Sequence, residues 1–371
     1  MRTATIAAAL LFGAVAVTFA VGLGTSIGDV QAALNRDDSG AVTVSANDGG
    51  TGPRGARAAD TNPADAAAIT AAIRAQPGTE AYYGISWQDV DVSGIAGTTS
   101  VVGYQGDSSW AALQMVAGTW FTGPGEAVVP TAFLQNAGVS IGDSITLTDA
   151  GRTVRLRVVG EAVSLRDSGN DVYTDYSTFT ALGIDMPPQN YQIELEPGTA
   201  EGGYIASLST ALGRLDGDPQ ASADTNGISP TVLAMDTLII ILTVMLVAVA
   251  GLGVLNTVVL DTRERVHDFG VFKALGMTPR QTVAMVLTSV GAVALPMGIV
   301  AVPIGVLVHD IVVPVMGHAA GTNLPPSDVA VYGMPALVLL AFGGLAIAML
   351  GALMPAGWAA RTGTATALRT E

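Results

Sequence analysis

Four long apolar runs dominate the pattern of hydrophobic and polar positions, one before and three after a long mixed stretch. They cover residues 3–28, 238–260, 283–308 and 329–355. An α-helix rises 1.5 Å per residue, so each run is long enough to cross a hydrocarbon core of ~30 Å. The pattern predicts a membrane protein with one transmembrane helix before a large domain and three after it.

The distribution of lysine and arginine predicts the orientation of these helices. Basic residues cluster in the segment 261–281, and others lie at Arg2 and in the C-terminal tail, whereas the loop 309–328 has none. Short loops rich in basic residues stay in the cytoplasm, while long domains translocate regardless of their charge. We therefore expect a multi-pass protein of the plasma membrane, with both termini cytoplasmic and the large domain outside.

The first apolar run has two interpretations. It holds 26 residues without a charge, from Thr3 to Gly28, preceded by Arg2. A signal peptide has an apolar region of about 7 to 15 residues, so this length favours an uncleaved membrane anchor. The alternative is cleavage within the Ala-rich sequence that follows, which would leave the large domain tethered only on its C-terminal side.

The mixed stretch predicts an α+β domain. Asp37 to Asp65 is rich in Gly, Ala, Asp, Asn and Thr and is interpreted as a mobile linker or long loop, and Asp216 to Ser229 is again polar and turn-rich. Asp149 to Arg152 forms a hairpin turn in which Gly151 can take φ > 0. Strands are expected at 82–86, 98–104, 125–129, 144–148 and 153–163, and helices at 63–76, 131–135, 176–182 and 205–215.

Together these patterns divide the chain into eight segments. The expected segments are transmembrane helix 1 (1–28), the extracytoplasmic α+β domain (29–234), transmembrane helix 2 (235–260), a charged cytoplasmic segment (261–281), transmembrane helix 3 (282–308), an extracytoplasmic loop (309–328), transmembrane helix 4 (329–355) and a cytoplasmic tail (356–371). Gly343-Gly344 in the last span would allow close helix approach.

The charged segment has the signals of a helix, a stop and a second start. Val266, Phe269, Phe272 and Leu275 recur every three residues and lay an apolar stripe along a helix that begins near Asp261. Gly276 is expected to end that helix in a left-handed conformation. Thr278, Pro279 and Gln281 then have the spacing of a capping box that opens the third span.

Composition narrows the classes of function. Of 371 residues 50% are hydrophobic and 13% charged, and there is no cysteine, which excludes disulfides and thiolate chemistry. The formal net charge is −15, and the 24 acidic residues and nine arginines between Thr25 and Ala234 account for all of it. The outer domain is therefore acidic, and nucleic acid is not an expected partner.

No catalytic, metal or cofactor site is predicted. Acidic pairs at a spacing of two, such as Asp89 with Asp91, Glu194 with Glu196 and Asp216 with Asp218, usually mark a solvated strand face. His267 is expected on the opposite side of the membrane from His309 and His318, so the histidines cannot share a metal. The one lysine, Lys273, has no Gly-rich loop before it and cannot belong to a P-loop. The spans carry no acidic or basic residue, which disfavours an ion-driven carrier.

The segment ERVHDFGVFKALGMTPRQ carries a family resemblance. Together with Pro355-Ala356, Ala360, Ala367-Leu368-Arg369 and Glu371 at the C-terminus, and the runs Gly118–Val129 and Gly138–Asp143, it resembles the FtsX-like permease family, the membrane subunits of MacB-type ABC systems. The residues that match the coupling segment of that family are Glu264, Arg265, Asp268, Phe269, Gly270, Lys273, Ala274 and Gly276.

The resemblance implies a mechanotransmission permease without catalytic activity of its own. A separate P-loop ATPase would dock on the cytoplasmic helix, and two permease units, as a homodimer or with a partner permease, would move their spans and outer domains in the surrounding lipid. The alternative is a membrane-anchored regulator or receptor that controls an envelope or cell-wall enzyme without transport. The transported substrate has no signal in the sequence.

Two departures from the family pattern stand in this chain. Asp268-Phe269 occupies the place where Glu-Ile is commoner, and Met1 to Thr3 leave no room for the basic amphipathic helix that usually precedes the first span. Two explanations of the second departure stay open: a start further upstream, or one four-span unit of a permease that elsewhere has two.

Overall fold

The computed structural model describes residues 2–34, 40–46, 63–215, 219–223, 230–264, 271–272 and 274–361. The chain divides into two compact units. The membrane unit contains residues 1–28, 230–315 and 327–371, and the outer unit contains residues 29–229 and 316–326. Each unit has its own hydrophobic core.

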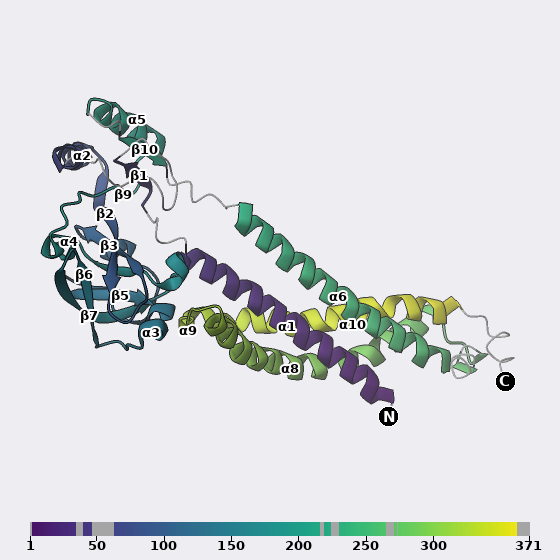
Figure 1. Ribbon diagram of the computed structural model, residues 1–371. Helices are drawn as coiled ribbons and strands as arrows, with labels where there is room; N and C mark the ends of the chain where they lie inside the picture. The colour runs from purple at the N-terminus through teal and green to yellow at the C-terminus, as the bar shows by residue number, and fades with distance from the viewer. Residues whose placement is uncertain are drawn as a thin grey trace. The chain divides into compact units, whose positions relative to one another are not determined.

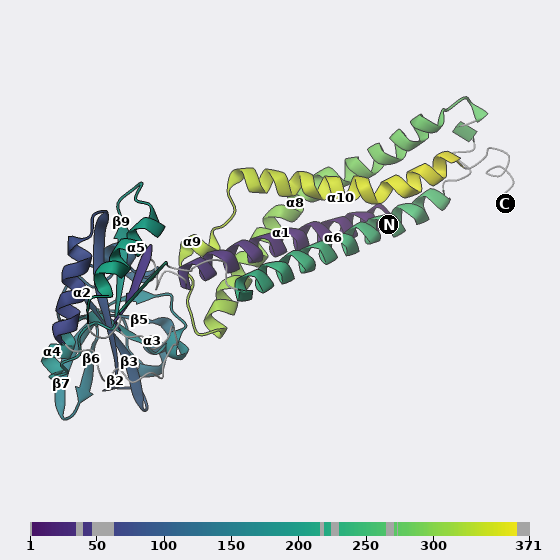
Figure 2. The same ribbon diagram turned by 90° about the horizontal axis from the view of Figure 1, so that it is seen from above.

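Among the described residues, four helices are long and apolar enough to cross a membrane. They are α1 (Arg2–Leu34), α6 (Pro230–Glu264), α8 (Pro279–Ala319) and α10 (Met334–Arg361), and the short α9 (Pro326–Val329) precedes the last. The four run side by side in Figures 1 and 2. The predicted arrangement of one N-terminal and three C-terminal apolar helices is confirmed.

The four long helices share one core within the membrane unit. Leu10 of α1, Val254 and Val258 of α6, Val286 and Val290 of α8 and three alanines of α10 form a single buried cluster. Small residues let the backbones approach: a Cβ at Gly351 of α10 would lie 2.9 Å from the carbonyl oxygen of Gly251 of α6. Interfaces of this kind are typical of helices in lipid, where packing replaces the hydrophobic effect.

The glycines expected to allow close approach in α10 are not the ones that do. Gly343 has open space where a Cβ would be, and a Cβ at Gly344 would meet the Cβ of Ala14 at an ordinary 3.5 Å. Tighter approaches of α10 lie at Gly351 and at Ala341, whose carbonyl oxygen would lie 2.9 Å from a Cβ at Gly298 of α8. A Gly-Gly pair thus shows where a helix can be approached, while the packing of the neighbouring helices decides where the approach is tightest.

Among its described residues, the outer unit is built on one sheet of ten strands with four α-helices of its own. The strands are β1 (Val42–Ser45), β2 (Thr79–Val92), β3 (Thr98–Gln105), β4 (Met115–Gly118), β5 (Glu126–Pro130), β6 (Ser144–Asp149), β7 (Arg152–Ala162), β8 (Val172–Asp175), β9 (Asn190–Leu195) and β10 (Gln220–Ala223). The four helices are α2 (Pro63–Ala75), α3 (Thr131–Ala137), α4 (Ser177–Leu182) and α5 (Glu201–Leu212), and the last turn of α8 also belongs to this unit.

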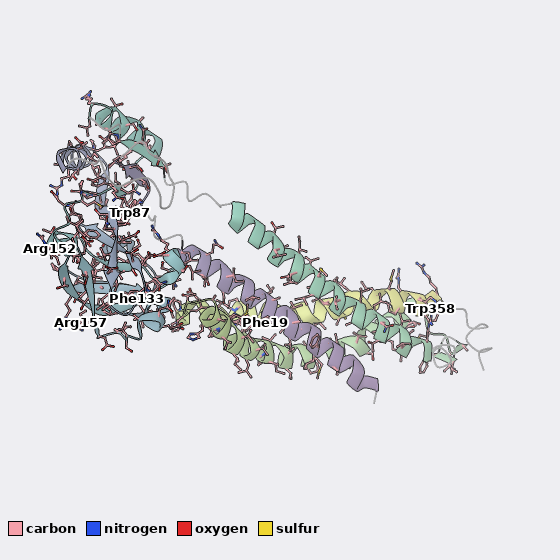
Figure 3. The ribbon with its side chains drawn as sticks, viewed as in Figure 1. Phe19, Trp87, Phe133, Arg152, Arg157 and Trp358 are labelled. Carbon is pink, nitrogen blue, oxygen red and sulfur yellow. The ribbon has the colours of Figure 1, made fainter. Side chains whose placement is uncertain are left out.

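Six of these strands close on themselves. The pairings run from β2 through β3, β8, β5, β7 and β6 and back to β2, which leaves no free edge in that ring. Alternate side chains point inward, so Val101 of β3 and Val172 of β8 lie in one core with Ile145 and Phe133. The side chains between them, Val102 and Tyr173, lie in a second, aromatic core on the outer face. Figure 3 labels Phe133 among the strands of this unit.

The rest of the sheet supports a separate layer. The strands β1, β9 and β10 carry α2 and α5, which lie beside them in Figure 1. Ile69 and Ile73 of α2 and Leu208 and Leu212 of α5 are fully buried against Val42 and Val44 of β1. The predicted α+β class is confirmed, and all five predicted strands and four predicted helices are found, with bounds shifted by a few residues.

Two predictions about the polar stretches were wrong. Val42–Ser45 lies within the supposed linker 37–65 but forms β1, paired with both β9 and β10, and Gln220–Ala223 forms β10. A four-residue strand offers only two inward positions, so its period is too short to be recognised in a Gly- and Asp-rich context. The two valines are fully buried, and tertiary pairing rather than local propensity fixes the strand.

The segment 309–328, which was expected to be a loop, is helical over most of its length. The helix α8 continues through His309 and Asp310 to Ala319, and α9 follows from Pro326. Pro296, Pro303 and Pro314 all lie inside α8. The expectation placed the helix end at the first charged residues, but a helix of 41 residues is longer than a bilayer requires, so charge does not mark its end.

The hairpin between β6 and β7 supplies a first test. Asp149 pairs with Arg152, and the two turn residues both have positive φ, 44° at Ala150 and 80° at Gly151, as a type I′ turn requires. Alanine is strained there, whereas asparagine tolerates the conformation. Ala150→Asn should raise the free energy of unfolding of the outer domain by about 0.5–1 kcal/mol, measured by thermal melting. Ala150→Val should lower it, and equal melting of both variants would contradict the turn assignment.

Candidate coupling site

The predicted coupling segment is described only in part. Glu264 is the last residue of α6, so Asp261 to Glu264 continue the second span instead of starting a separate helix. Arg265, Asp268, Phe269 and Gly270 lie outside the described residues, as do Val266, His267 and Lys273. Residues 271, 272 and 274 are helical, and Ala274 and Gly276 are both exposed.

The described part of the segment is a helical turn that ends at Gly276. The amide of Leu275 donates to the carbonyl of Val271 at 3.0 Å, and the amide of Met277 donates to the carbonyl of Phe272 at 3.0 Å. Gly276 has a φ of 102°, which a side chain would disfavour. The predicted stop at Gly276 is confirmed.

The apolar stripe of this turn is on the surface. Phe272 is 40% exposed and Leu275 is 80% exposed, although both are large apolar side chains in a segment outside the four spans predicted from the sequence. Scattered apolar residues on a surface need no explanation, but these two lie three residues apart, on one face of the same helical turn. The stripe is therefore available to a partner.

The capping box that follows is confirmed. The amide and hydroxyl of Thr278 donate to Oε1 of Gln281 at 2.8 and 3.1 Å, and the amide of Gln281 donates back to Oγ1 of Thr278 at 3.4 Å. Pro279 is the first residue of α8, where its missing N–H costs nothing. The box fixes the direction in which α8 leaves the coupling segment.

Removing the cap should loosen the start of α8. Thr278→Ala deletes the side-chain half of the box and should cost about 1 kcal/mol, seen as faster amide exchange of residues 280–282 in detergent. Thr288→Ala is the matched control, because the hydroxyl of Thr288 donates at 2.7 Å to the carbonyl of Ala284 within the same helix and caps nothing. Equal exchange in the two variants would contradict a capping role.

A polar cluster that the sequence did not reveal joins three helices of the membrane unit. His309 of α8 is fully buried, with Nε2 at 3.1 Å from Oγ of Ser26 of α1 and Nδ1 at 3.3 Å from Oδ1 of Asp310. The hydroxyl of Ser26 donates to the carbonyl of Asp328 of α9 at 2.6 Å. Because the serine proton is used in that bond, the cluster holds the helices together and offers no activated nucleophile.

The other candidate groups stay separate. Asp89 and Asp91 are exposed on β2, as a solvated strand face predicts, and Glu194 is half-buried beside exposed Glu196. Asp216 and Asp218 lie outside the described residues. Within the part of the chain that the structure describes, no three His, Asp or Glu side chains come close enough to hold a metal ion.

Comparisons with known proteins cover both units. The sequence matches the family described as the MacB-like periplasmic core domain over residues 3–211, and the FtsX-like permease C-terminal family over residues 240–364. No curated protein matches the sequence.

Solved structures also match the chain. The periplasmic region of MacB from Actinobacillus actinomycetemcomitans is 17% identical, covers 52% of this chain and 92% of its own, and has a TM-score of 0.40. The extracellular domain of the noncanonic ABC-type transporter YknZ from Gram-positive bacteria is 11% identical, covers 42% of this chain and 87% of its own, and has a TM-score of 0.35.

Proposed function

Because the chain belongs to the FtsX-like permeases with a MacB-like periplasmic core domain, we propose that this permease subunit of an ABC transporter works by mechanotransmission. A separate P-loop ATPase docks on the coupling segment 261–281, and ATP-driven closure of two ATPases moves the outer domains. This movement of the outer domains exports a substrate or extracts it from the membrane. The substrate does not have to cross the middle of the bilayer.

The observation that carries this proposal is the exposed stripe of the coupling segment. Phe272 and Leu275 lie on a helical turn that ends at Gly276, and the capping box at Thr278 follows directly. A force applied to this turn reaches α6 and α8 at their ends, because only the segment 265–278 separates the two helices. Glu264, Arg265, Asp268 and Lys273 would supply the charged contacts around the apolar stripe.

The orientation follows from the same proposal. The coupling segment and both termini lie in the cytoplasm, where the ATPase has its nucleotide, and the outer unit lies on the opposite side of the plasma membrane. The exposed apolar side chains of α6 face lipid or a second permease unit, since this helix has Leu238, Val244, Val249 and Leu252 each at least 61% exposed. We propose two units per transporter, identical or paired with a related permease.

Charge reversal in the coupling segment tests the proposal. The full chain, purified in mild detergent, should retain a P-loop ATPase, and Glu264→Lys or Arg265→Glu should release it because both remove charged contacts at the docking surface. Arg361→Glu is the matched control, since Arg361 is an exposed basic residue at the end of α10 and outside the coupling segment.

The competing function is a membrane-anchored regulator of an envelope enzyme. In that case the purified chain retains no P-loop ATPase, and charge reversal at Glu264 or Arg265 leaves the activity in cells intact. A gene for a P-loop ATPase beside the gene for this chain would favour the permease.

A further inference from the structure

A buried carboxylate lies in the outer unit, where its described hydrogen-bond partners are uncharged. Glu161, near the end of β7, is only 6% exposed, and no ion pair among the described residues includes it. A carboxylate removed from water is costly unless hydrogen bonds compensate it. The donors that surround Glu161 are therefore the groups on which its position depends.

Two donors converge on one oxygen of this carboxylate. The hydroxyl of Thr131, the first residue of α3, donates to Oε1 of Glu161 at 2.5 Å, and Nδ2 of Asn323 donates to the same atom at 2.9 Å. The backbone amide of Asn323 donates to Oγ1 of Thr131 at 2.8 Å. The three residues form a closed ring in which every hydrogen bond has one donor and one acceptor, and we name it the Glu161 clasp.

The clasp is joined to α8 by a rigid turn. At the end of this helix the amide of Thr322 donates to the carbonyl of Gly317 and the amide of Gly321 donates to that of His318, with Gly321 at a φ of 85°. This is a Schellman motif, which fixes the residues after the helix relative to its last turn. Asn323 is the next residue, so its place in the clasp is fixed by the end of α8.

Further contacts surround the same turn. Nδ1 of His318 lies 3.1 Å from Oδ1 of Asn323 and 3.3 Å from Nε2 of Gln135 on α3, and Thr322 is 4% exposed. Residues 316–326 belong to the outer unit, whereas α8 up to Val315 belongs to the membrane unit. One continuous helix thus begins at the coupling segment and ends in a turn that is bound to the outer domain.

We propose that the Glu161 clasp transmits movement of α8 to the outer domain. Glu161, Thr131 and Asn323 are positioning residues in this role, and they give the outer domain a third attachment beside its chain connections to α1 and α6. The inference rests on the proposed function, because it requires that an ATPase moves the start of α8. When α8 moves, the hydrogen bonds of the clasp move the end of β7 and the start of α3 in the same direction.

An exchange of donor and acceptor tests the clasp. Asn323→Asp keeps the shape of the side chain but sets a second carboxylate against Glu161, which should open the ring. Glu161→Gln alone should be mild, because its amide oxygen still accepts from Thr131 and Asn323. The double variant Glu161→Gln/Asn323→Asp restores a donor opposite an acceptor with the two roles exchanged, so it should recover what Asn323→Asp loses.

Two measurements are made on the full chain, reconstituted with the ATPase that co-purifies with it. The first tests whether the clasp forms, and the second tests whether it transmits movement to the outer domain. Amide exchange over residues 320–325 should be at least about tenfold faster in Asn323→Asp, the effect expected for a lost charge-assisted hydrogen bond, and normal in the double variant. The chain has no cysteine, so a dye at Ala181→Cys on the exposed end of α4 reports on the outer domain alone. Its ATP-driven signal should fall severalfold in Asn323→Asp and return in the double variant.

Glu126→Gln is the matched control, because the carboxylate of Glu126 accepts from the hydroxyl of Thr122 at 3.0 Å, outside the clasp. It should change neither readout. If amide exchange over residues 320–325 accelerates in Asn323→Asp but the ATP-driven dye signal persists, the clasp does not transmit movement. If amide exchange in Asn323→Asp is unchanged, the clasp does not form. An unsubstituted chain whose exchange is protected but whose dye never responds to ATP would contradict the proposed function instead.

Discussion

Replacing Phe272 by alanine should weaken binding of the ATPase about 10- to 100-fold, the effect of removing one well-buried aromatic side chain from an interface. Phe272 is 40% exposed in the chain alone, so that part of the side chain is open to contacts with the partner. Leu275→Ala should act in the same direction, since Leu275 is 80% exposed on the same turn. The measurement is a titration of the purified ATPase against the full chain in nanodiscs.

Trp358→Ala is the control for this prediction. Trp358 is 48% exposed near the end of α10 (Figure 3) and is at least as large and apolar as Phe272, but it lies outside the coupling segment. We expect ATPase affinity within about threefold of the unsubstituted chain. Equal losses in Phe272→Ala and Trp358→Ala would mean that general damage to the membrane unit, rather than a docking contact, explains the effect.

Truncating Ile145 should destabilise the outer domain by about 2–5 kcal/mol, because the side chain fills the interior of the closed six-stranded ring and is fully buried. The cavity left by Ile145→Ala is enclosed by strands that pair with one another and by side chains of α3 and α4 in the same core, so the surroundings can collapse into it only in part. Thermal melting of the full chain, followed through the aromatic signal of the outer domain, measures the loss.

The same substitution four residues earlier is the control. Ile141 is 39% exposed in the turn before β6, so Ile141→Ala should cost less than about 1 kcal/mol. If both variants melt alike, the strands β2, β3, β8, β5, β7 and β6 do not enclose a core. Both substitutions delete the same atoms, so the difference in melting between Ile145→Ala and Ile141→Ala measures the effect of burial.

Features with a local signal in the sequence could be predicted, because the residues that cause them are neighbours along the chain. Runs of more than 20 apolar residues identified all four long helices, and turn residues such as Gly151, Gly276 and Thr278 identified a hairpin, a helix stop and a cap. Each of these signals is local. Their physical causes act within a few residues of the chain.

Features that depend on pairing across the chain could not be predicted. The four residues of β1 become a strand only because β9 and β10 lie on either side, and the ring of six strands closes only in three dimensions. Glu161 looks like one more acidic residue among many, and Asn323 like part of a polar loop. Their hydrogen bond joins positions 162 residues apart, which no local pattern encodes.

The coupling segment was identified by its resemblance to a protein family and not by a local pattern alone. Its charges and its helix signals fit any cytoplasmic connector, and the resemblance to the permease family gave Glu264, Arg265, Asp268 and Lys273 their proposed role. Within the described residues, what the structure adds is the exposure of Phe272 and Leu275 on a turn with a fixed end at Gly276. The charged contacts stay a prediction.

A photo-crosslinking amino acid at position 275 tests the central claim most directly, since Leu275 is the most exposed large apolar side chain of the coupling segment among its described residues. Irradiation in intact cells should join the full chain to a P-loop ATPase, and the same label at position 358 should not. A label at 275 that joins only lipid, or a protein without a P-loop, would contradict the account.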